Sequence, residues 1–344
     1  MKNKTPKITG TGWHVPDKIR LNDDPIFDWL WKHVDNIKKS FAGYDKRHIL
    51  SEGEGLSDIM FPAALMALKN AGKKPEDIDL LLGCVSISEF VQPNVLSDVH
   101  ARLGLPERTW VIPIGDDYSN YASCLLMADA LIRSGRAENI LICIGGNWSR
   151  NVDYHTPQSV SAADGAGAAV VSLSDDPSHW AVFDQCTVTD SSYYGSMFTA
   201  GLEYQFKKSG TNVIPPGRRD YGTLYTPNFF QITPEGGKGF TAFGAEAALS
   251  PVIELLKKNK LTAADVTFMP HQTSQVLINF WCDHLDPRPA QVVSTIEKFA
   301  NVTVATHALN LAYLEAHGNI EKDYLLMLAL GPDMHANAML LKRN

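Results

Sequence analysis

Residues 64–85 have the sequence ALMALKNAGKKPEDIDLLLGCV, and residues 251–272 have the sequence PVIELLKKNKLTAADVTFMPHQ. Each segment starts with apolar residues at helical spacing, passes through a short polar connection and ends in an almost continuous apolar run. Asp77 and Asp265, 188 residues apart, hold corresponding places before the two runs. We predict that each segment forms an amphipathic helix followed by a buried strand.

A second pair of segments repeats at nearly the same distance. Residues 138–146 (ENILICIGG) and 323–331 (DYLLMLALG) are strand-like runs that end in glycine, and Gly145 and Gly331 are 186 residues apart. Two nearly equal offsets indicate an internal duplication. Helices that alternate with wholly apolar strands predict sheets covered by helices. We therefore expect two α/β halves, residues 1–175 and 176–344, packed as a duplicated five-layer α/β/α/β/α architecture.

The composition is that of an ordinary globular chain. Of its 344 residues, 44% are hydrophobic and 20% charged, and the net charge of −7 without a basic face argues against nucleic-acid binding. Five cysteines without a Cys-x-x-Cys pair, two of them (Cys84 and Cys143) inside apolar runs, indicate a reducing compartment. The N-terminus lacks the apolar core of a signal peptide, and no run of about 18 apolar residues occurs. These features predict a cytoplasmic protein.

Residues 190–244 interrupt the repeated pattern with many Gly, Pro, Tyr and Phe residues. We expect a long irregular insertion, which usually serves as a lid, a pocket wall or a dimer contact. Its aromatic residues suit an apolar or aromatic substrate and equally a dimer interface, so both uses stay open. They are Tyr193, Tyr194, Phe198, Tyr204, Phe229 and Phe230.

Several motifs, in their order along the chain, resemble those of the ketoacyl-ACP synthase III family. They are KRHIL (46–50), RSGRAENILICIGG (133–146), ADGAGAAVV (163–171), MPHQTS (269–274) and FANVTVATHAL (299–309). The resemblance implies the thiolase fold and a homodimer. Enzymes of that family hold an acyl group on a cysteine and join it to malonyl-ACP with loss of carbon dioxide. Their assisting His and Asn correspond to His271 and Asn301.

The position of the family's cysteine holds a tyrosine in this chain. That cysteine opens a long buried helix, expected here at about residues 119–134, and counting back without gaps puts Tyr118 in its place. A phenol, with a pKa of about 10 against about 8.5 for a thiol, is a poor nucleophile, so we expect Tyr118 to orient substrate or donate a proton. Ser119, with His271 as base, is the alternative nucleophile, although a helix cap is the favoured explanation for it. We likewise attribute Asp116 and Asp117 to capping.

Two further departures from the family concern recognition and charge stabilisation. Pro332, in LGPDMHANAM, stands where a backbone N–H completes the oxyanion hole, and proline has no N–H. Ile37 and Phe41 stand near the places of the Trp and Arg that grip coenzyme A, so we do not expect standard coenzyme A recognition. Cys124, within the expected helix, is interpreted as a core residue.

The resemblance leaves three functions open. The first is a divergent acyltransferase or condensing enzyme of fatty acid, polyketide or secondary metabolism. It would act on acyl or malonyl thioesters without a cysteine nucleophile, with His271 as general base and Asn301 as hydrogen-bond donor to the carbonyl or enolate. The alternatives are a catalytically inactive subunit that pairs with a Cys-containing paralogue, and a module that binds an acyl carrier or acyl ligand.

The expected partners follow from the same resemblance. They are acyl carrier protein or acyl-CoA, supplying the thioester as substrate, and a second copy or a paralogue of the chain. No tightly bound cofactor is expected, because the glycine-rich loops match neither a dinucleotide fingerprint nor a P-loop. No metal is expected, because the histidines at 14, 100, 155, 307 and 335 show no metal-ligand spacing.

Overall fold

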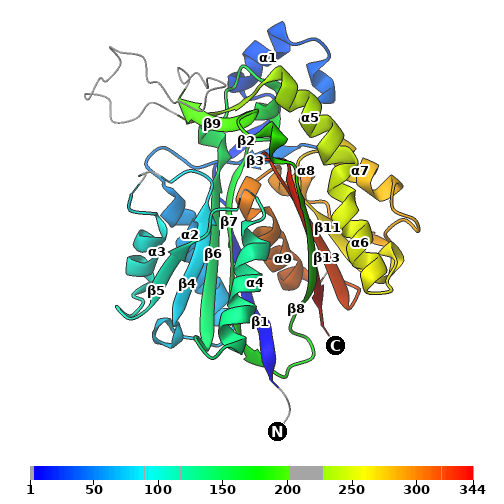
Figure 1. The fold of residues 1–344 in the computed structure, drawn as a ribbon. Coiled ribbons are helices and arrows are strands. Elements are labelled where there is room, and N and C mark those ends of the chain that lie inside the picture. The colour runs from blue at the N-terminus through cyan, green and yellow to red at the C-terminus, as the bar shows by residue number, and fades with distance from the viewer. Residues whose placement is uncertain are drawn as a thin grey trace.

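Two five-stranded sheets form the centre of the computed structural model, which describes residues 4–88, 90, 92–116, 118–201, 228–318 and 320–343 (Figure 1). Across the first sheet, the strands are β1 (Thr5–His14), β7 (Asp164–Ser174), β6 (Asn139–Asn147), β4 (Leu80–Val85) and β5 (Trp110–Pro113). Across the second sheet, they are β12 (Gln291–Val292), β11 (Val266–Pro270), β13 (Tyr324–Gly331), β14 (His335–Lys342) and β8 (Ala181–Thr189). β4 runs parallel to β5 and β6, and β11 runs parallel to β12 and β13, whereas the other neighbours are antiparallel. Starting from the short edge strands β5 and β12 and crossing each sheet, the neighbouring strands pair in the same succession: parallel, parallel, antiparallel and antiparallel.

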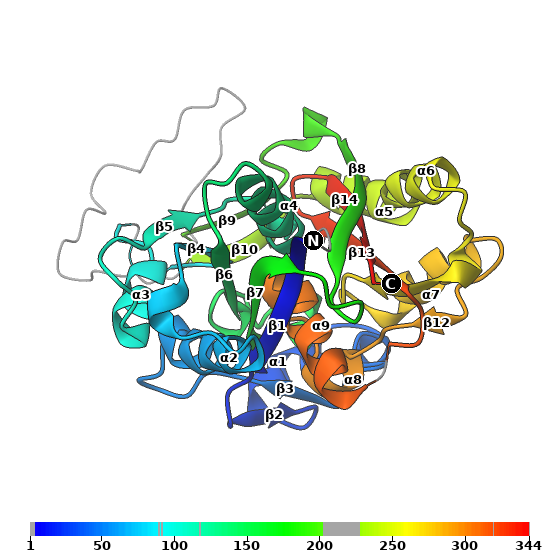
Figure 2. The same cartoon turned by 90° about the horizontal axis from the view of Figure 1, so that it is seen from below.

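Helices complete the five layers (Figures 1 and 2). The helices that cover the sheets are α2 (Leu56–Asn70), α3 (Leu96–Leu103), α4 (Asn120–Arg133), α9 (Thr306–His317), α5 (Pro234–Ala245), α6 (Ser250–Lys258) and α7 (Gln275–Asp283). The helices α4 and α9 lie between the sheets, α2 and α3 cover the outer face of the first sheet, and α5 to α7 cover the second. The predicted α/β/α/β/α architecture of the thiolase fold is thus confirmed.

The repeated segments form the predicted elements. Residues 64–85 contain the end of α2 and all of β4, and residues 251–272 contain all but the first residue of α6 and all of β11. In β6, every residue from 140 to 144 is fully buried, because helices cover both faces of the first sheet. Apolar periodicity was therefore a sound guide to these elements.

The insertion is more regular than predicted. Within its described part, strands β9 (Met197–Gly201) and β10 (Asn228–Ile232) pair antiparallel at the upper end of the sheets, and α5 follows (Figure 1). The glycines of α5 allow close packing: a Cβ on Gly236 would lie 2.3 Å from the Ser196 carbonyl oxygen, and one on Gly239 would lie 2.3 Å from the Tyr193 ring. The expectation of an irregular segment was wrong there, because these glycines serve packing within a helix. The predicted Tyr204 lies outside the described residues.

Short elements at the same end complete the fold. They are β2 (Ile19–Leu21), β3 (Lys46–His48), α1 (Asp28–His33) and α8 (Ile296–Phe299). The stretch Pro234–Lys258, which contains α5 and α6, is long and apolar enough to cross a membrane by length and composition alone. Half of its most apolar window is buried inside the fold, as in the core helices of globular proteins.

Asp164, at the start of β7, ties three segments together. Its fully buried carboxylate accepts hydrogen bonds from the Leu50 N–H (2.7 Å), the Ser149 N–H (2.8 Å) and the Ser149 hydroxyl (2.6 Å). Asp164→Ala would leave these buried donors without an acceptor, so we expect the free energy of unfolding to fall by about 3 kcal/mol. Urea denaturation measures this loss. The exposed Asp23→Ala is the control, and a loss below about 1 kcal/mol for Asp164→Ala would contradict the assigned role.

Candidate active site

Three predicted site residues lie at the same end of the sheets. Tyr118 precedes α4, His271 follows β11, and Asn301 follows α8. The Tyr118 and His271 rings are stacked, with their centroids 5.5 Å apart and their planes 19° from parallel. Tyr118 and Asn301 line the same cavity. The fold thus brings together residues that are far apart in the sequence.

Tyr118 has an unusual backbone conformation. Its φ of 68° lies in the left-handed region, which is uncommon for residues other than glycine and is often found at functional sites. The side chain is half-buried and lies over the His271 imidazole. The Tyr118 phenol, which covers the His271 ring, therefore borders the surrounding cavities.

His271 is fully buried and lines neither of the two cavities beside Tyr118. Its backbone N–H donates to the Leu328 carbonyl at 2.8 Å, but neither ring nitrogen has a hydrogen-bond partner in the part of the chain that the structure describes. Burial, with a smaller contribution from His307, lowers the pKa of His271 to about 3. In this conformation the imidazole is neutral, weakly basic and covered by the phenol.

His307 is a second buried histidine, which the sequence analysis did not assign to the site. Its ring centroid lies 6.2 Å from that of His271. Burial lowers its pKa to about 4, and backbone carbonyl groups of Met269 and Leu328 oppose that shift. Its place within the motif at 299–309 was the only signal that could have pointed to it.

Asn301 is held with its amide in a defined orientation. Its Oδ1 accepts a hydrogen bond from the Thr303 N–H (2.8 Å), and its backbone N–H donates to the Ser161 carbonyl (2.9 Å). The preceding Ala300 and the following Thr303 have positive φ angles of 53° and 51°. Because Oδ1 is engaged, the Nδ2 group is the part of the amide that remains for a ligand in the cavity.

The capping role predicted for the Ser119 side chain is contradicted, and the described residues show no hydrogen bond between Ser119 and His271. The residue occupies the N-cap position of α4 and is buried, but its Oγ has no hydrogen-bond partner among the described residues, so it neither caps the helix nor meets His271. Its ψ of 1° departs from the extended conformation in which an N-cap side chain reaches the helix N–H groups.

Asp116, before α4, lies close to side chains of both halves of the chain. Asp116 Oδ2 accepts from the Ser123 hydroxyl, and Oδ1 lies 3.8 Å from His335 Nε2. Among the described residues, the hydrogen bond to the Asp116 carboxylate comes from a side chain of α4, and no helix N–H group is seen to donate to it. Asp117 lies outside the described residues.

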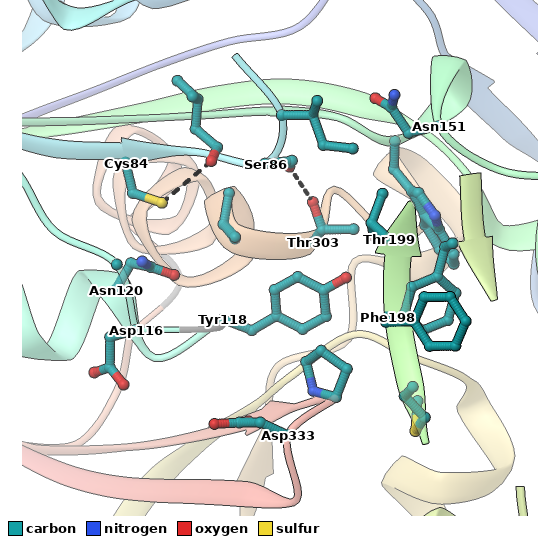
Figure 3. A pocket seen from close by; sticks show the side chains of 18 of the residues that line it. Cys84, Ser86, Asp116, Tyr118, Asn120, Asn151, Phe198, Thr199, Thr303 and Asp333 are labelled. Atoms are coloured by element: carbon teal, nitrogen blue, oxygen red, sulfur yellow. Dashed lines mark hydrogen bonds between the residues drawn. The ribbon is translucent and has the colours of Figure 1, made fainter. Parts of the chain in front are cut away.

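Two cavities meet at Tyr118. The Asn301 cavity, of about 470 Å³, is lined by Asn301 and has Lys39, Ala42 and Val276 among its other lining residues. The Cys84 cavity, of about 420 Å³, is lined by Cys84 and polar side chains of both halves (Figure 3). The residues that line both cavities are Tyr118, Trp148, Met197, Phe230 and Pro332.

The cysteines of the site region differ in their placement. Cys124 is fully buried as expected, and burial raises its pKa well above the ordinary value. Cys84 is buried in the core, as its apolar run indicated, and it also lines a cavity; its thiol donates to the Val85 carbonyl at 3.3 Å. Its position near the carboxyl end of a strand, where α/β sites collect, was the missed signal.

The residues that depart from the family pattern are packed as follows. Ile37 and Phe41 are only 4% and 6% exposed, and Phe41 stacks on Trp31 with ring centroids 4.6 Å apart. Neither side chain is presented to a ligand. Pro332 lines both cavities and supplies no N–H there. Over the described ranges, no three His, Cys, Asp or Glu side chains are placed to hold a metal ion.

The duplicated sheets and the site at their shared end define a thiolase-fold protein. Residues 119–191 match the family described as 3-oxoacyl-[acyl-carrier-protein] synthase III, and residues 256–343 match its C-terminal part. The chain is 30% identical to the β-ketoacyl-[acyl-carrier-protein] synthase III of Campylobacter jejuni, over 96% of this chain and 95% of that protein. It is 29% identical to that of Rickettsia prowazekii, over 98% and 99%. The chain therefore belongs to the β-ketoacyl-[acyl-carrier-protein] synthase III family.

A solved structure shows the same fold. The 3-oxoacyl-[acyl-carrier-protein] synthase III from Aquifex aeolicus VF5 matches with a TM-score of 0.80 and 23% identity, covering 98% of this chain and 99% of that one. The match extends over both halves of the chain.

Proposed function

We propose that this protein is an acyltransferase or condensing enzyme that acts on acyl or malonyl thioesters without forming an acyl-cysteine. The observation that carries the proposal is the Asn301 cavity, which holds a fixed amide donor beside Tyr118 and has no cysteine among its described lining residues. The relatives are named for acyl-carrier-protein substrates, so a carrier-bound thioester is the substrate class that we assign.

The Asn301 cavity suits the arm of such a thioester. Val276, at the cavity lining, is 75% exposed, and Lys39 and Ser40 also line it. A phosphate on the carrier arm would meet the Lys39 cation, while the acyl part would extend along the apolar lining toward Asn301. Because Ile37 and Phe41 are buried, we favour acyl carrier protein over coenzyme A as the carrier.

Asn301 and His271 would stabilise charge on the thioester oxygen. The Asn301 Nδ2 would donate to the carbonyl of an acyl group or to the enolate that a malonyl group forms on losing carbon dioxide. The low pKa of His271 keeps the imidazole neutral, and a neutral imidazole has one N–H to donate and one nitrogen to accept a proton. Tyr118 would have to turn away before His271 meets the substrate, because the phenol now covers it.

Incubation with malonyl- and octanoyl-pantetheine tests this function. We expect release of carbon dioxide from the malonyl thioester or transfer of the octanoyl group. Mass spectrometry of the products measures either reaction, and mass spectrometry of the intact protein should show no added mass. A stable acyl adduct on any cysteine would contradict transfer without an acyl-enzyme.

A soluble cytoplasmic location and a homodimer also belong to this proposal. Trp110, on edge strand β5, is 64% exposed and offers apolar surface for a second copy of the chain.

Asn301→Asp probes the assigned donor. The substitution keeps an oxygen for the Thr303 N–H, but it removes Nδ2 and places a negative charge beside the developing enolate. We expect turnover to fall on the order of 100-fold, the usual cost of losing one such donor. The exposed Asn36→Asp, which makes the same chemical change elsewhere, should leave turnover unchanged. Equal rates for Asn301→Asp and the unaltered protein would remove Asn301 from the site.

A second candidate is a catalytically silent subunit that pairs with a Cys-containing paralogue. Two features favour this silent role: the Tyr118 ring covers His271, and Pro332 lacks a backbone N–H. Turnover by the purified chain alone would exclude this role. Turnover that appears only when a Cys-containing paralogue co-purifies with the chain would establish it.

A further inference from the structure

The Cys84 cavity lies behind a wall that separates it from the Asn301 cavity. Tyr118 and four apolar residues form that wall, because they line both spaces. In Figure 3 the Tyr118 ring lies near the centre of the view, with Cys84 and Asn120 on one side of it and Phe198 and Thr199 on the other. A molecule in either cavity would therefore touch the same phenol.

An unpartnered acceptor lies in the Cys84 cavity. Asn120 is 1% exposed, and its Nδ2 donates to the Ile114 carbonyl at 2.8 Å, which fixes the orientation of the amide. Its Oδ1 is buried, and no hydrogen-bond donor meets it within the described part of the chain. Buried polar atoms are rarely left in that state, so this oxygen is available to accept a hydrogen bond from a water or a molecule bound in the cavity.

The other polar groups of the cavity come from both halves of the chain. The Ser86 and Thr303 hydroxyls form a hydrogen bond of 2.8 Å, and the Asp116 carboxylate also lines the space. Apolar side chains, among them Ile87 and Phe198, supply the rest of the lining. This combination suits a small molecule with an apolar body and one or two hydroxyl or amine groups.

We propose that the Cys84 cavity binds the acyl acceptor, a small alcohol or amine whose O–H or N–H donates to Asn120 Oδ1. The proposal rests on the function proposed above and adds the second substrate to it. Both substrates are then bound at once, one on each side of Tyr118, and no covalent intermediate separates their binding.

The transfer step balances without any further reagent. When Tyr118 turns aside, the acceptor oxygen or nitrogen attacks the thioester carbonyl carbon, and the carbon–sulfur bond breaks. The acyl group passes to the acceptor, and the acceptor's proton ends on the departing sulfur, which leaves as a thiol. The products are an ester or amide and the free carrier thiol.

Two unreactive probes test the two cavities separately. Benzyl alcohol represents the acceptor, and benzyl methyl ether is its counterpart without a donor. The amide analogue of octanoyl-pantetheine represents the thioester. By ligand-observed NMR titration, we expect the alcohol and the amide to bind together, and the alcohol to bind about tenfold more tightly than the ether because only the alcohol donates to Asn120.

A pair of matched variants assigns each probe to its cavity. Ile87→Trp fills the Cys84 cavity and should weaken the alcohol at least tenfold while sparing the amide; Ala42→Trp, in the Asn301 cavity, should do the reverse. Competition between the two probes, absence of alcohol binding, or an unchanged alcohol affinity in Ile87→Trp would each overturn the proposal. Alcohol binding without amide binding would instead remove the thioester function on which the acceptor role rests.

Discussion

Replacing Tyr118 with cysteine is expected to convert a chain that carries no acyl adduct into one that is acylated by short acyl thioesters. The residue directly precedes the N-cap of α4, a helix of 14 residues whose free N–H groups stabilise a thiolate. A lowered thiol pKa of about 7 would give on the order of ten times more thiolate at neutral pH than an ordinary cysteine. The smaller side chain also uncovers His271. Intact-protein mass spectrometry after incubation with octanoyl-pantetheine measures the change.

The rate of this acylation should show the effect of Pro332. Without an N–H at that position, the oxyanion hole lacks one donor, and acylation should be slower on the order of 100-fold than with a complete site. Tyr118→Ser is the matched control, because it opens the same space at the same backbone angle without a thiol. A folded Tyr118→Cys protein that gains no mass would show that residue 118 does not occupy the place of a nucleophile.

The architecture was predictable because its signals are local and repeated. The apolar runs at 80–85 and 266–270 follow amphipathic helices at similar distances, and each forms an interior strand of its sheet. A strand covered on both faces must be apolar throughout, so the pattern survives whatever the tertiary details are. The duplication then fixed the number of layers.

The site was only partly predictable, because its decisive features depend on contacts between the halves. The identities of Tyr118, His271 and Asn301 came from the resemblance to the family, but the stacking of the phenol on the imidazole depends on a left-handed residue that the sequence does not reveal. Ser119 is of a residue type that commonly caps helices, but its backbone conformation is not that of an N-cap whose side chain reaches the helix N–H groups. Cys84 sits in an apolar run, and only the packing around α4 shows that it faces a cavity.

Acidification from pH 7.5 to 5.0 is expected to lower the free energy of unfolding by about 4 kcal/mol through His271 and His307. Burial depresses both pKa values, to about 3 and about 4, from an ordinary value of 6.5. The unfolded chain therefore takes up protons first as the pH falls. The stability contribution of each histidine is complete above the unfolded pKa and is lost progressively as the pH drops toward the folded values.

Urea denaturation at the two pH values separates these histidines from other groups. At pH 5.0 each histidine lies about 1.5 pH units below its unfolded pKa, which corresponds to about 2 kcal/mol apiece. His271→Gln or His307→Gln should remove about that amount from the pH-dependent difference, whatever its effect at pH 7.5. The exposed His284→Gln should leave the difference unaltered. If His271→Gln keeps the full difference in the free energy of unfolding between the two pH values, the His271 imidazole of the unaltered protein is hydrated in solution. Tyr118 would then not be the cover that keeps the site neutral and closed.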